Sequence, residues 1–260
     1  MEIDLFNKII SELSPFLTNI NLYFQGEPML HPDFFTFIEN CSGIHSVVST
    51  NGHFLTEENA AKIVKSKLSK LIISLDGTSQ EIYSIYRKNG NFDTVLDGIR
   101  NVAKAGRRAG TSLKTEIQFL VSRHNEHQIP QIRKIASDLG VSLRLKSMQL
   151  TEKEDAGKWL PEDSRYSRYK SDKGVWKNKN KMPDRCARLW FNPVVTWDGK
   201  VLPCCFDKNG DYVMGDLRTE TFREIWNGPR YKIFRKSVLT GRHMIEICTN
   251  CTSGLSGVRY

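Results

Sequence analysis

Cysteine is the residue type whose positions in this chain point most clearly to chemistry. One of the six cysteines stands at position 41, and the others follow in the last third of the sequence, at Cys186, Cys204, Cys205, Cys248 and Cys251. In a chain whose first residues read as an amphipathic helix rather than a secretory signal, clustered thiols indicate metal binding more than disulfides. We therefore expect a thiolate-ligated site in the C-terminal third.

Two pairs of these cysteines have the spacing of ligands. Cys186 is followed by twelve residues, Gly199, four residues and then Cys204, and Cys248 and Cys251 form a Cys-x2-Cys pair. Two ligands on a hairpin and two on a tight turn can converge on one four-thiolate site, which suits Zn²⁺ or an iron–sulfur cluster on geometry alone. The spacing by itself slightly favours zinc.

A second group of residues follows apolar segments that are expected to be strands. The group contains Gly26, Glu27, Pro28, Ser49, Asn51, Ser74 and Asp76, with Gln118 inside a further strand. Asn-Gly and Asp-Gly form turns anywhere, so each position taken singly is explained as a turn residue. Recurrence at successive strand ends instead favours a binding site for a ligand with an amine, a ribose and a base.

The elements that must position these residues alternate along residues 1–150. Strand patterns occupy residues 20–25, 45–52, 70–77, 114–121 and 141–150, and helix patterns lie between them, as at 56–68 and 126–140. Alternating strands and helices predict an α/β domain with parallel strands and right-handed crossovers. A barrel and an open sheet both remain possible, and in both the functional groups belong at the carboxyl ends of the strands.

The remainder of the chain divides into a connector and a second domain. Residues 151–185 show no clear period and are expected to be a basic connector, and residues 186–260 form a smaller unit. That unit contains a hairpin signal, since Asp198-Gly199 separates the β-branched runs 192–197 and 200–205. A helix is expected over residues 221–239.

Composition limits the classes of protein to consider. The chain has 260 residues and a formal charge of +9, and no run of 18 apolar residues that would predict a membrane helix. The basic residues gather in 165–185 without a nucleic-acid-binding motif, so we expect a solvated basic connector there, with a nucleic-acid-binding face as the lesser alternative. The cytoplasm is the default location.

The motifs together resemble a radical S-adenosylmethionine (SAM) enzyme with an auxiliary-cluster domain of the SPASM or shorter twitch type. The segments that carry the resemblance are LYFQGEPMLHPDF, VVSTNG, IISLDG, FLVSRHNEH and CARLWFNPVVTWDGKVLPCCFD. The resemblance implies a partial (β/α)6 barrel and a small C-terminal hairpin and helix domain. It also implies that Gly26, Glu27 and Pro28 bind the amino group of the methionine moiety, and that the later strand ends face cofactor or substrate.

The same resemblance changes the expectation for the cysteines. The pattern of Cys186, Gly199 and Cys204 followed by Cys248 and Cys251 resembles that of a twitch domain, which implies one auxiliary [4Fe–4S] cluster rather than zinc. Consecutive strand residues point to opposite faces, so the Gly-x4-Cys spacing selects Cys204 over Cys205 as the ligand. Cys41 is expected to be structural.

One family motif does not occur in this chain. Radical SAM enzymes carry a Cys-x3-Cys-x2-Cys loop after their first strand, and no such triplet is present in the 260 residues. We therefore expect a barrel that lacks its first strand, with SAM and a second [4Fe–4S] cluster bound only in a longer form. Whether this chain is itself an enzyme is left open, since a non-catalytic iron–sulfur or zinc-binding module with a relic barrel is the alternative.

The resemblance also implies partners without choosing among them. Enzymes of this kind oxidise or modify peptides or small molecules, and their clusters are reduced by proteins such as flavodoxin or ferredoxin. We expect a peptide or small-molecule substrate and no membrane partner.

Overall fold

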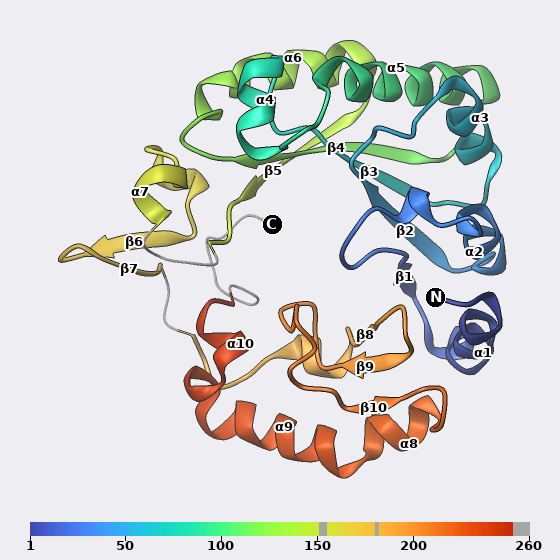
Figure 1. The fold of residues 1–260 in the computed structure, drawn as a ribbon, viewed down its shortest axis with the longest axis vertical. Helices are drawn as coiled ribbons and strands as arrows, with labels where there is room; N and C mark the ends of the chain where they lie inside the picture. The colour runs from blue at the N-terminus through green and yellow to red at the C-terminus, as the bar shows by residue number, and fades with distance from the viewer. Residues whose placement is uncertain (151–154, 180–181, 252–260) are drawn as a thin grey trace. The chain divides into compact units, whose positions relative to one another are not determined.

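The computed structural model of the chain describes residues 1–150, 155–179 and 182–251 (Figure 1). The described residues fall into two compact units. Residues 18–177 form one, here called the sheet unit, and residues 1–17 together with 178–251 form the other, here called the cysteine unit.

Five parallel strands form the centre of the sheet unit, as the alternating pattern predicted. Their order is β1-β2-β3-β4-β5, and their bounds are β1 (Asn19–Asn21), β2 (His45–Thr50), β3 (Lys70–Ser74), β4 (Lys114–Val121) and β5 (Ser142–Ser147). The connecting helices are α2 (Phe34–Asn40), α3 (Glu57–Lys65), α4 (Gln80–Tyr86), α5 (Phe92–Ala109) and α6 (Ile129–Leu139). The helices lie along one side of the sheet (Figure 1), so the predicted α/β architecture is confirmed.

Alternation along the strands separates an apolar face from a polar one. Val48 of β2, Ile73 of β3 and Phe119 of β4 belong to the buried core shared with the helices. The intervening positions point the other way, because successive strand side chains alternate between faces. The parallel register places Ser49 opposite Ile72 and Ser74 opposite Gln118, so all three polar residues share the face that the helices do not cover.

Residues at the helix boundaries cap two helices of this unit. The N–H of Asn59 donates to Thr56 Oγ1 at 3.2 Å, as expected for the N-cap of α3. Gly140 follows α6 with φ = 68°, the left-handed conformation that a helix C-cap favours and that glycine adopts without a Cβ clash.

The first predicted strand is shorter than expected. Residues 20–25 were expected as a strand, whereas β1 ends at Asn21 and only the N–H of Leu22 still reaches the Val47 carbonyl, at 2.8 Å. Pro28 then begins the 3-10 helix Pro28–Leu30. Gly26, with φ = 81°, lies between them in a conformation that other residues rarely adopt, which turns the chain away from the sheet.

The segment expected as a connector contains packed structure. It forms α7 (Ala156–Trp159) and a two-stranded sheet of β6 (Tyr169–Asp172) and β7 (Val175–Asn178). Leu160 and Tyr169 are buried in a small cluster with Met148 and Leu150 of the preceding chain. Residues 151–154 and 180–181 of the expected connector lie outside the described residues.

The cysteine unit is built on the predicted hairpin. The strand β8 (Val194–Val195) pairs antiparallel with β9 (Lys200–Leu202) across Gly199, whose φ is 87°. The strand β10 (Gly215–Asp216) pairs antiparallel with β9, and α10 (Glu246–Thr249) lies near the end of the described chain. The hairpin prediction is therefore confirmed.

The single helix expected over residues 221–239 is two helices. They are α8 (Phe222–Asn227), which begins with a capping box of Thr221 and Glu224, and α9 (Pro229–Gly241). Pro229 has no N–H to continue the hydrogen-bond ladder of α8, but its fixed φ suits the first position of a new helix. The break therefore follows from the Gly228-Pro229 pair.

The N-terminal helix packs with the C-terminal residues. The helix α1 (Ile3–Leu13) contributes Ile9 to a core with Leu189, Val201, Phe234 and Val238, and Glu12 accepts the Phe222 N–H at 2.8 Å. The sequence analysis had placed this helix with residues 1–150, because periodicity shows that a helix has an apolar face without showing what covers it. Within the described ranges, no helix combines the length and apolar character needed to cross a membrane.

Candidate functional site

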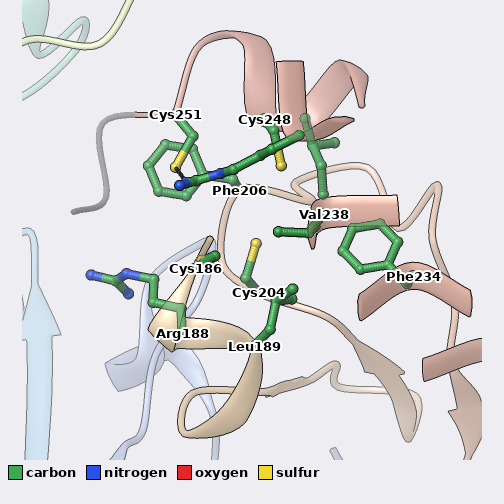
Figure 2. Close-up of a pocket in the computed structure, with 11 residues that line it drawn as sticks. Cys186, Arg188, Leu189, Cys204, Phe206, Phe234, Val238, Cys248 and Cys251 are labelled. Atoms are coloured by element: carbon green, nitrogen blue, oxygen red, sulfur yellow. Dashed lines mark hydrogen bonds between the residues drawn. The ribbon is translucent and has the colours of Figure 1, made fainter. Parts of the chain in front are cut away.

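Four cysteines of the cysteine unit line one recess (Figure 2). Cys186 precedes the 3-10 helix Ala187–Trp190, Cys204 follows strand β9, Cys248 lies in α10 and Cys251 follows it. The recess is narrow and partly open to solvent, and its apolar walls include Leu189, Phe234 and Val238. These are the four cysteines that the spacing paired, so the structure brings together residues 65 positions apart in sequence.

Short backbone contacts hold the cysteine-bearing loops. The N–H of Cys251 donates to the Cys248 carbonyl at 3.0 Å, which closes the Cys-x2-Cys turn. The N–H of Asp207 donates to the Cys204 carbonyl, and the buried Asp207 carboxylate accepts the N–H groups of Asp211 and Tyr212 at 2.8 and 3.0 Å. Both loops are therefore fixed by the protein itself.

Burial shapes the acid–base chemistry of these thiols. Burial raises the pKa of Cys204 to about 12, and the neighbouring Cys205, Cys251 and Cys248 add to the rise. Burial also raises the pKa of Cys248, against a hydrogen bond from Arg242 that lowers it. A thiolate in such a place requires a positive partner, and a bound metal supplies one by displacing the proton.

An arginine lies directly beside the thiols. Arg242 is 1% exposed, and its Nη2 donates to Cys251 Sγ at 3.4 Å while its Nη1 donates to the Arg185 carbonyl at 2.7 Å. The four thiols are a donor set that fits a four-thiolate iron–sulfur cluster or Zn²⁺, and the apolar walls and the adjacent cation form its surroundings. With the side chains as they stand, no group of three or more His, Cys, Asp or Glu within the described ranges is close enough for a metal ion.

The other two cysteines lie away from the recess. Cys205 does not line it, and its Sγ accepts a hydrogen bond from Arg188 Nη1 at 3.6 Å. Cys41 is completely buried in the sheet unit, where burial raises its pKa to about 11. An inert, buried thiol is what the sequence analysis expected at position 41.

The polar strand ends of the sheet unit form a second candidate site. Ser49, Ser74 and Gln118 share the face of the sheet opposite the helices, and Ser74 and Gln118 are direct partners in the register. Glu116 also lies on this face, where it pairs with Lys70 and Arg144 at 2.9 Å each. This charged group adjoins the expected cofactor-binding residues.

Glu27 binds groups of the protein itself. Its Oε1 accepts the Thr50 hydroxyl at 2.7 Å and the Met29 N–H at 3.1 Å, and its Oε2 accepts the Asn51 N–H at 2.6 Å. The carboxylate therefore joins the Gly26–Pro28 turn to the end of β2. Asn51 in turn accepts the His53 N–H through Oδ1 at 2.9 Å, which closes its own turn.

The Asp76 carboxylate also binds groups of the protein itself. It is 2% exposed, its Oδ2 accepts Arg87 Nε at 2.6 Å and its Oδ1 accepts the Leu120 N–H at 2.7 Å. Burial raises the pKa of Asp76, and the guanidinium of Arg87 and the Leu120 N–H oppose that rise. Glu27 and Asp76 thus position strand ends in this structure, and their contact with a cofactor stays a prediction, as it does for the other strand-end residues.

We expect E27A to lower the free energy of unfolding of the sheet unit by about 1–2 kcal/mol, because two backbone N–H groups and a hydroxyl lose their acceptor. E27Q keeps one acceptor oxygen and should lose less. Urea unfolding followed by circular dichroism measures both. A change in E27A no larger than in E27Q would contradict this role of the carboxylate.

Sequence reasoning missed two arginines that the structure places at these sites. Arg87 lies eleven positions after its partner Asp76, and Arg242 lies 58 positions after Asp184, whose carboxylate accepts the Arg242 N–H at 2.8 Å. Neither arginine belongs to a motif, so no local signal could have identified them.

Two family models match this chain, one over its N-terminal half and the other over the region of the clustered cysteines. The model described as the Radical SAM superfamily matches residues 1–134, and the model described as SPASM, an iron–sulfur cluster-binding domain, matches residues 186–252. The second range contains all four cysteines that line the recess.

Two curated proteins and one solved structure illustrate the relationship. The "Tungsten-containing aldehyde ferredoxin oxidoreductase cofactor-modifying protein" of Pyrococcus furiosus is 24% identical, over 97% of this chain and 79% of its own length. The "Mycofactocin maturase MftC" of Mycobacterium tuberculosis is 33% identical, over 46% of this chain and 30% of its own length.

The solved structure is that of anSMEcpe with bound AdoMet, which matches with a TM-score of 0.62 at 15% identity, over all of this chain and 80% of that one. At this identity the match shows a shared fold. Because the superfamily model covers more than half of the chain and the cluster-domain model covers the recess, this protein belongs to the Radical SAM superfamily and carries a C-terminal SPASM domain.

Proposed function

We propose that Cys186, Cys204, Cys248 and Cys251 hold one auxiliary [4Fe–4S] cluster. The observation that carries this proposal is the convergence of these four thiols on a single recess inside the residues that match an iron–sulfur cluster-binding domain. Four cysteine thiolates are the complete ligand set of such a cluster. The twitch-type spacing of these cysteines supports one cluster rather than two.

The chain's own residues would define the surroundings of the cluster. The hairpin presents Cys204, the closed Cys-x2-Cys turn presents Cys248 and Cys251, and Leu189, Phe234 and Val238 limit access of water. A bound cluster supplies one-electron transfer, and its potential depends on charge, hydrogen bonds to sulfur and exposure. Arg242 already donates to one of the ligand sulfurs.

We further propose that the polar strand ends of the sheet unit bind SAM. Support comes from Ser49, Ser74 and Gln118 on one face of the sheet and from the solved structure of similar fold, which holds AdoMet. The Gly26–Pro28 turn, fixed by Glu27, would receive the amino group of the methionine moiety. The interpretation of the sheet as a (β/α)6 barrel without its first strand remains part of this proposal.

The substrate class is a peptide or a small molecule. Support comes from the names of two relatives, one a maturase and the other a cofactor-modifying protein. The corresponding activity is radical oxidation or modification of that substrate in the cytoplasm, with electrons supplied by a protein such as flavodoxin or ferredoxin. The 260 residues contain no Cys-x3-Cys-x2-Cys triplet, so we propose that the chain as given does not itself cleave SAM reductively.

Anaerobic reconstitution with iron and sulfide tests this function. The 260-residue chain is expected to hold about four irons and a similar amount of sulfide, the content of one cube. Incubation with SAM and dithionite should release no 5′-deoxyadenosine, measured by chromatography.

The same preparation separates the alternatives. About one zinc per chain that iron and sulfide cannot displace would instead indicate a zinc-stabilised module. About eight irons, or release of 5′-deoxyadenosine, would show that the assignment of a single cluster is wrong.

A further inference from the structure

Arg242 is a fully buried cation in the wall of the candidate cluster site. It is among the largest completely buried side chains of the described residues, at 1% exposure, and it lines the recess with the four cysteines. Burying a charge is strongly unfavourable unless a partner compensates it, so a buried arginine requires a specific counterpart. The position of the guanidinium indicates what that counterpart is.

The contacts of the guanidinium point to the cysteine sulfurs. Nη2 donates to Cys251 Sγ at 3.4 Å, and Cys248 lines the same recess as Arg242. Nη1 donates to the Arg185 carbonyl at 2.7 Å, which fixes the orientation of the planar group. One edge of the arginine thus anchors to the backbone while the other edge faces the ligand sulfurs.

Two other charged side chains near the recess, Asp184 and Arg188, differ from Arg242 in the groups they contact or in their burial. The Asp184 carboxylate accepts the backbone N–H of Arg242 at 2.8 Å. Arg188 lines the recess too, but its guanidinium contacts Cys205, which is outside the lining, and its side chain is only half-buried. Arg242 is therefore a fully buried cation that contacts one of the thiols expected to become ligands.

We propose that Arg242 is the counter-charge of the auxiliary cluster and sets its reduction potential. The inference rests on the proposed function, namely that these four cysteines hold the cluster. Four thiolates bring more negative charge than the iron–sulfur core brings positive charge, so the bound group is an anion that adds a further negative charge on reduction. A buried positive charge beside it favours the reduced state, and hydrogen bonds to sulfur act in the same direction.

The prediction concerns the one-electron reduction of the reconstituted 260-residue chain by dithionite, followed by electron paramagnetic resonance. R242Q removes the charge and should disfavour reduction by at least tenfold, which is a midpoint about 59 mV more negative for one electron. R242K keeps a positive charge and should stay within about threefold of the unmodified chain.

R230Q is the matched control. Arg230 is an exposed residue of the same unit whose guanidinium donates to the Val213 carbonyl. R230Q therefore removes the same charge as R242Q, but from a solvent-exposed position. It should leave the midpoint unchanged, because solvent screens an exposed charge. A shift of equal size in R230Q and R242Q would overturn the proposal.

The outcomes separate this inference from the proposed function. If the unmodified chain holds no cluster, the proposed function fails and this inference fails with it. If the unmodified chain holds its cluster and R242Q holds one of unchanged midpoint, Arg242 is a structural residue and only this inference is wrong.

If R242Q cannot retain a cluster at all, the iron content of R242K distinguishes a counter-charge from a purely structural arginine. A counter-charge predicts that lysine restores the iron content. A purely structural arginine predicts that lysine loses the iron as glutamine does, because lysine lacks the planar fork whose two nitrogens donate separately to the Arg185 carbonyl and the Cys251 sulfur.

Discussion

Replacing Cys248 with alanine is expected to remove nearly all the iron from the reconstituted chain and to unfold much of the cysteine unit. Cys248 is 7% exposed, lines the recess and belongs to the apolar core of its unit. A cluster held by the native state contributes its binding free energy to folding, so loss of one of four ligands removes both the metal and that stabilisation. We expect fewer than about one iron per chain and a loss of more than about 4 kcal/mol.

The positions of the tryptophans make this result measurable. Trp190, Trp197 and Trp226 belong to the cysteine unit, while Trp159 and Trp176 belong to the sheet unit. Iron is quantified on the purified protein, and denaturant unfolding is followed by tryptophan fluorescence, to which Trp226, packed against Phe222 and Tyr231, contributes from the cysteine unit. Circular dichroism of the parallel sheet and its helices should change less.

C205A is the matched control for C248A. Cys205 is adjacent to a proposed ligand in sequence but does not line the recess, so its replacement should leave about four irons per chain. Retention of the full iron content in C248A, or its loss in C205A, would show that the four ligands are assigned wrongly. The pair therefore tests the choice between neighbouring cysteines as well as the site itself.

Replacing Asp76 with alanine is expected to destabilise the sheet unit by about 3 kcal/mol, because one partner of a buried ion pair is removed. The change leaves Arg87 without its carboxylate and the Leu120 N–H without its acceptor. Arg87 is 29% exposed and recovers some hydration, which is why the value is at the lower end for a buried pair.

The measurement is urea unfolding of D76A and D76N beside E58A. D76N keeps an oxygen for the Leu120 N–H and should lose less than D76A. Glu58 pairs with Lys62 on an exposed helix surface, so E58A should be indistinguishable from the unmodified chain. Equal stability of D76A and E58A would contradict the role of Asp76 as the link between β3, β4 and α4.

This result also bears on the proposed SAM site. Because Asp76 and Glu27 hold strand ends through protein contacts, loss of SAM binding in their alanine variants would not by itself identify a direct contact. Ser49 and Gln118 are half-buried on the polar face and are the better positions for that test.

Local patterns in the sequence were sufficient for the parallel sheet, for the hairpin and for the grouping of four cysteines around one recess. Alternation of strands and helices predicted the parallel sheet, Asp198-Gly199 predicted the hairpin, and the Cys-x2-Cys pair predicted a closed turn. These features depend on residues within a few positions of one another, where backbone geometry and side-chain period act directly. The break between α8 and α9 was also readable at Gly228-Pro229, although it was missed.

Only the tertiary structure decided which groups meet across the chain. It places α1 in the core with Val201 and Val238, binds the Glu27 carboxylate to Thr50 and Asn51, and sets the Arg242 guanidinium beside Cys251. Each of these contacts depends on burial and on the packing of elements distant in sequence, and a charged residue carries no local mark of the partner that will compensate it. The sequence by itself therefore determined the parallel sheet, the hairpin and the grouping of the thiols, while packing determined the electrostatic surroundings of those thiols.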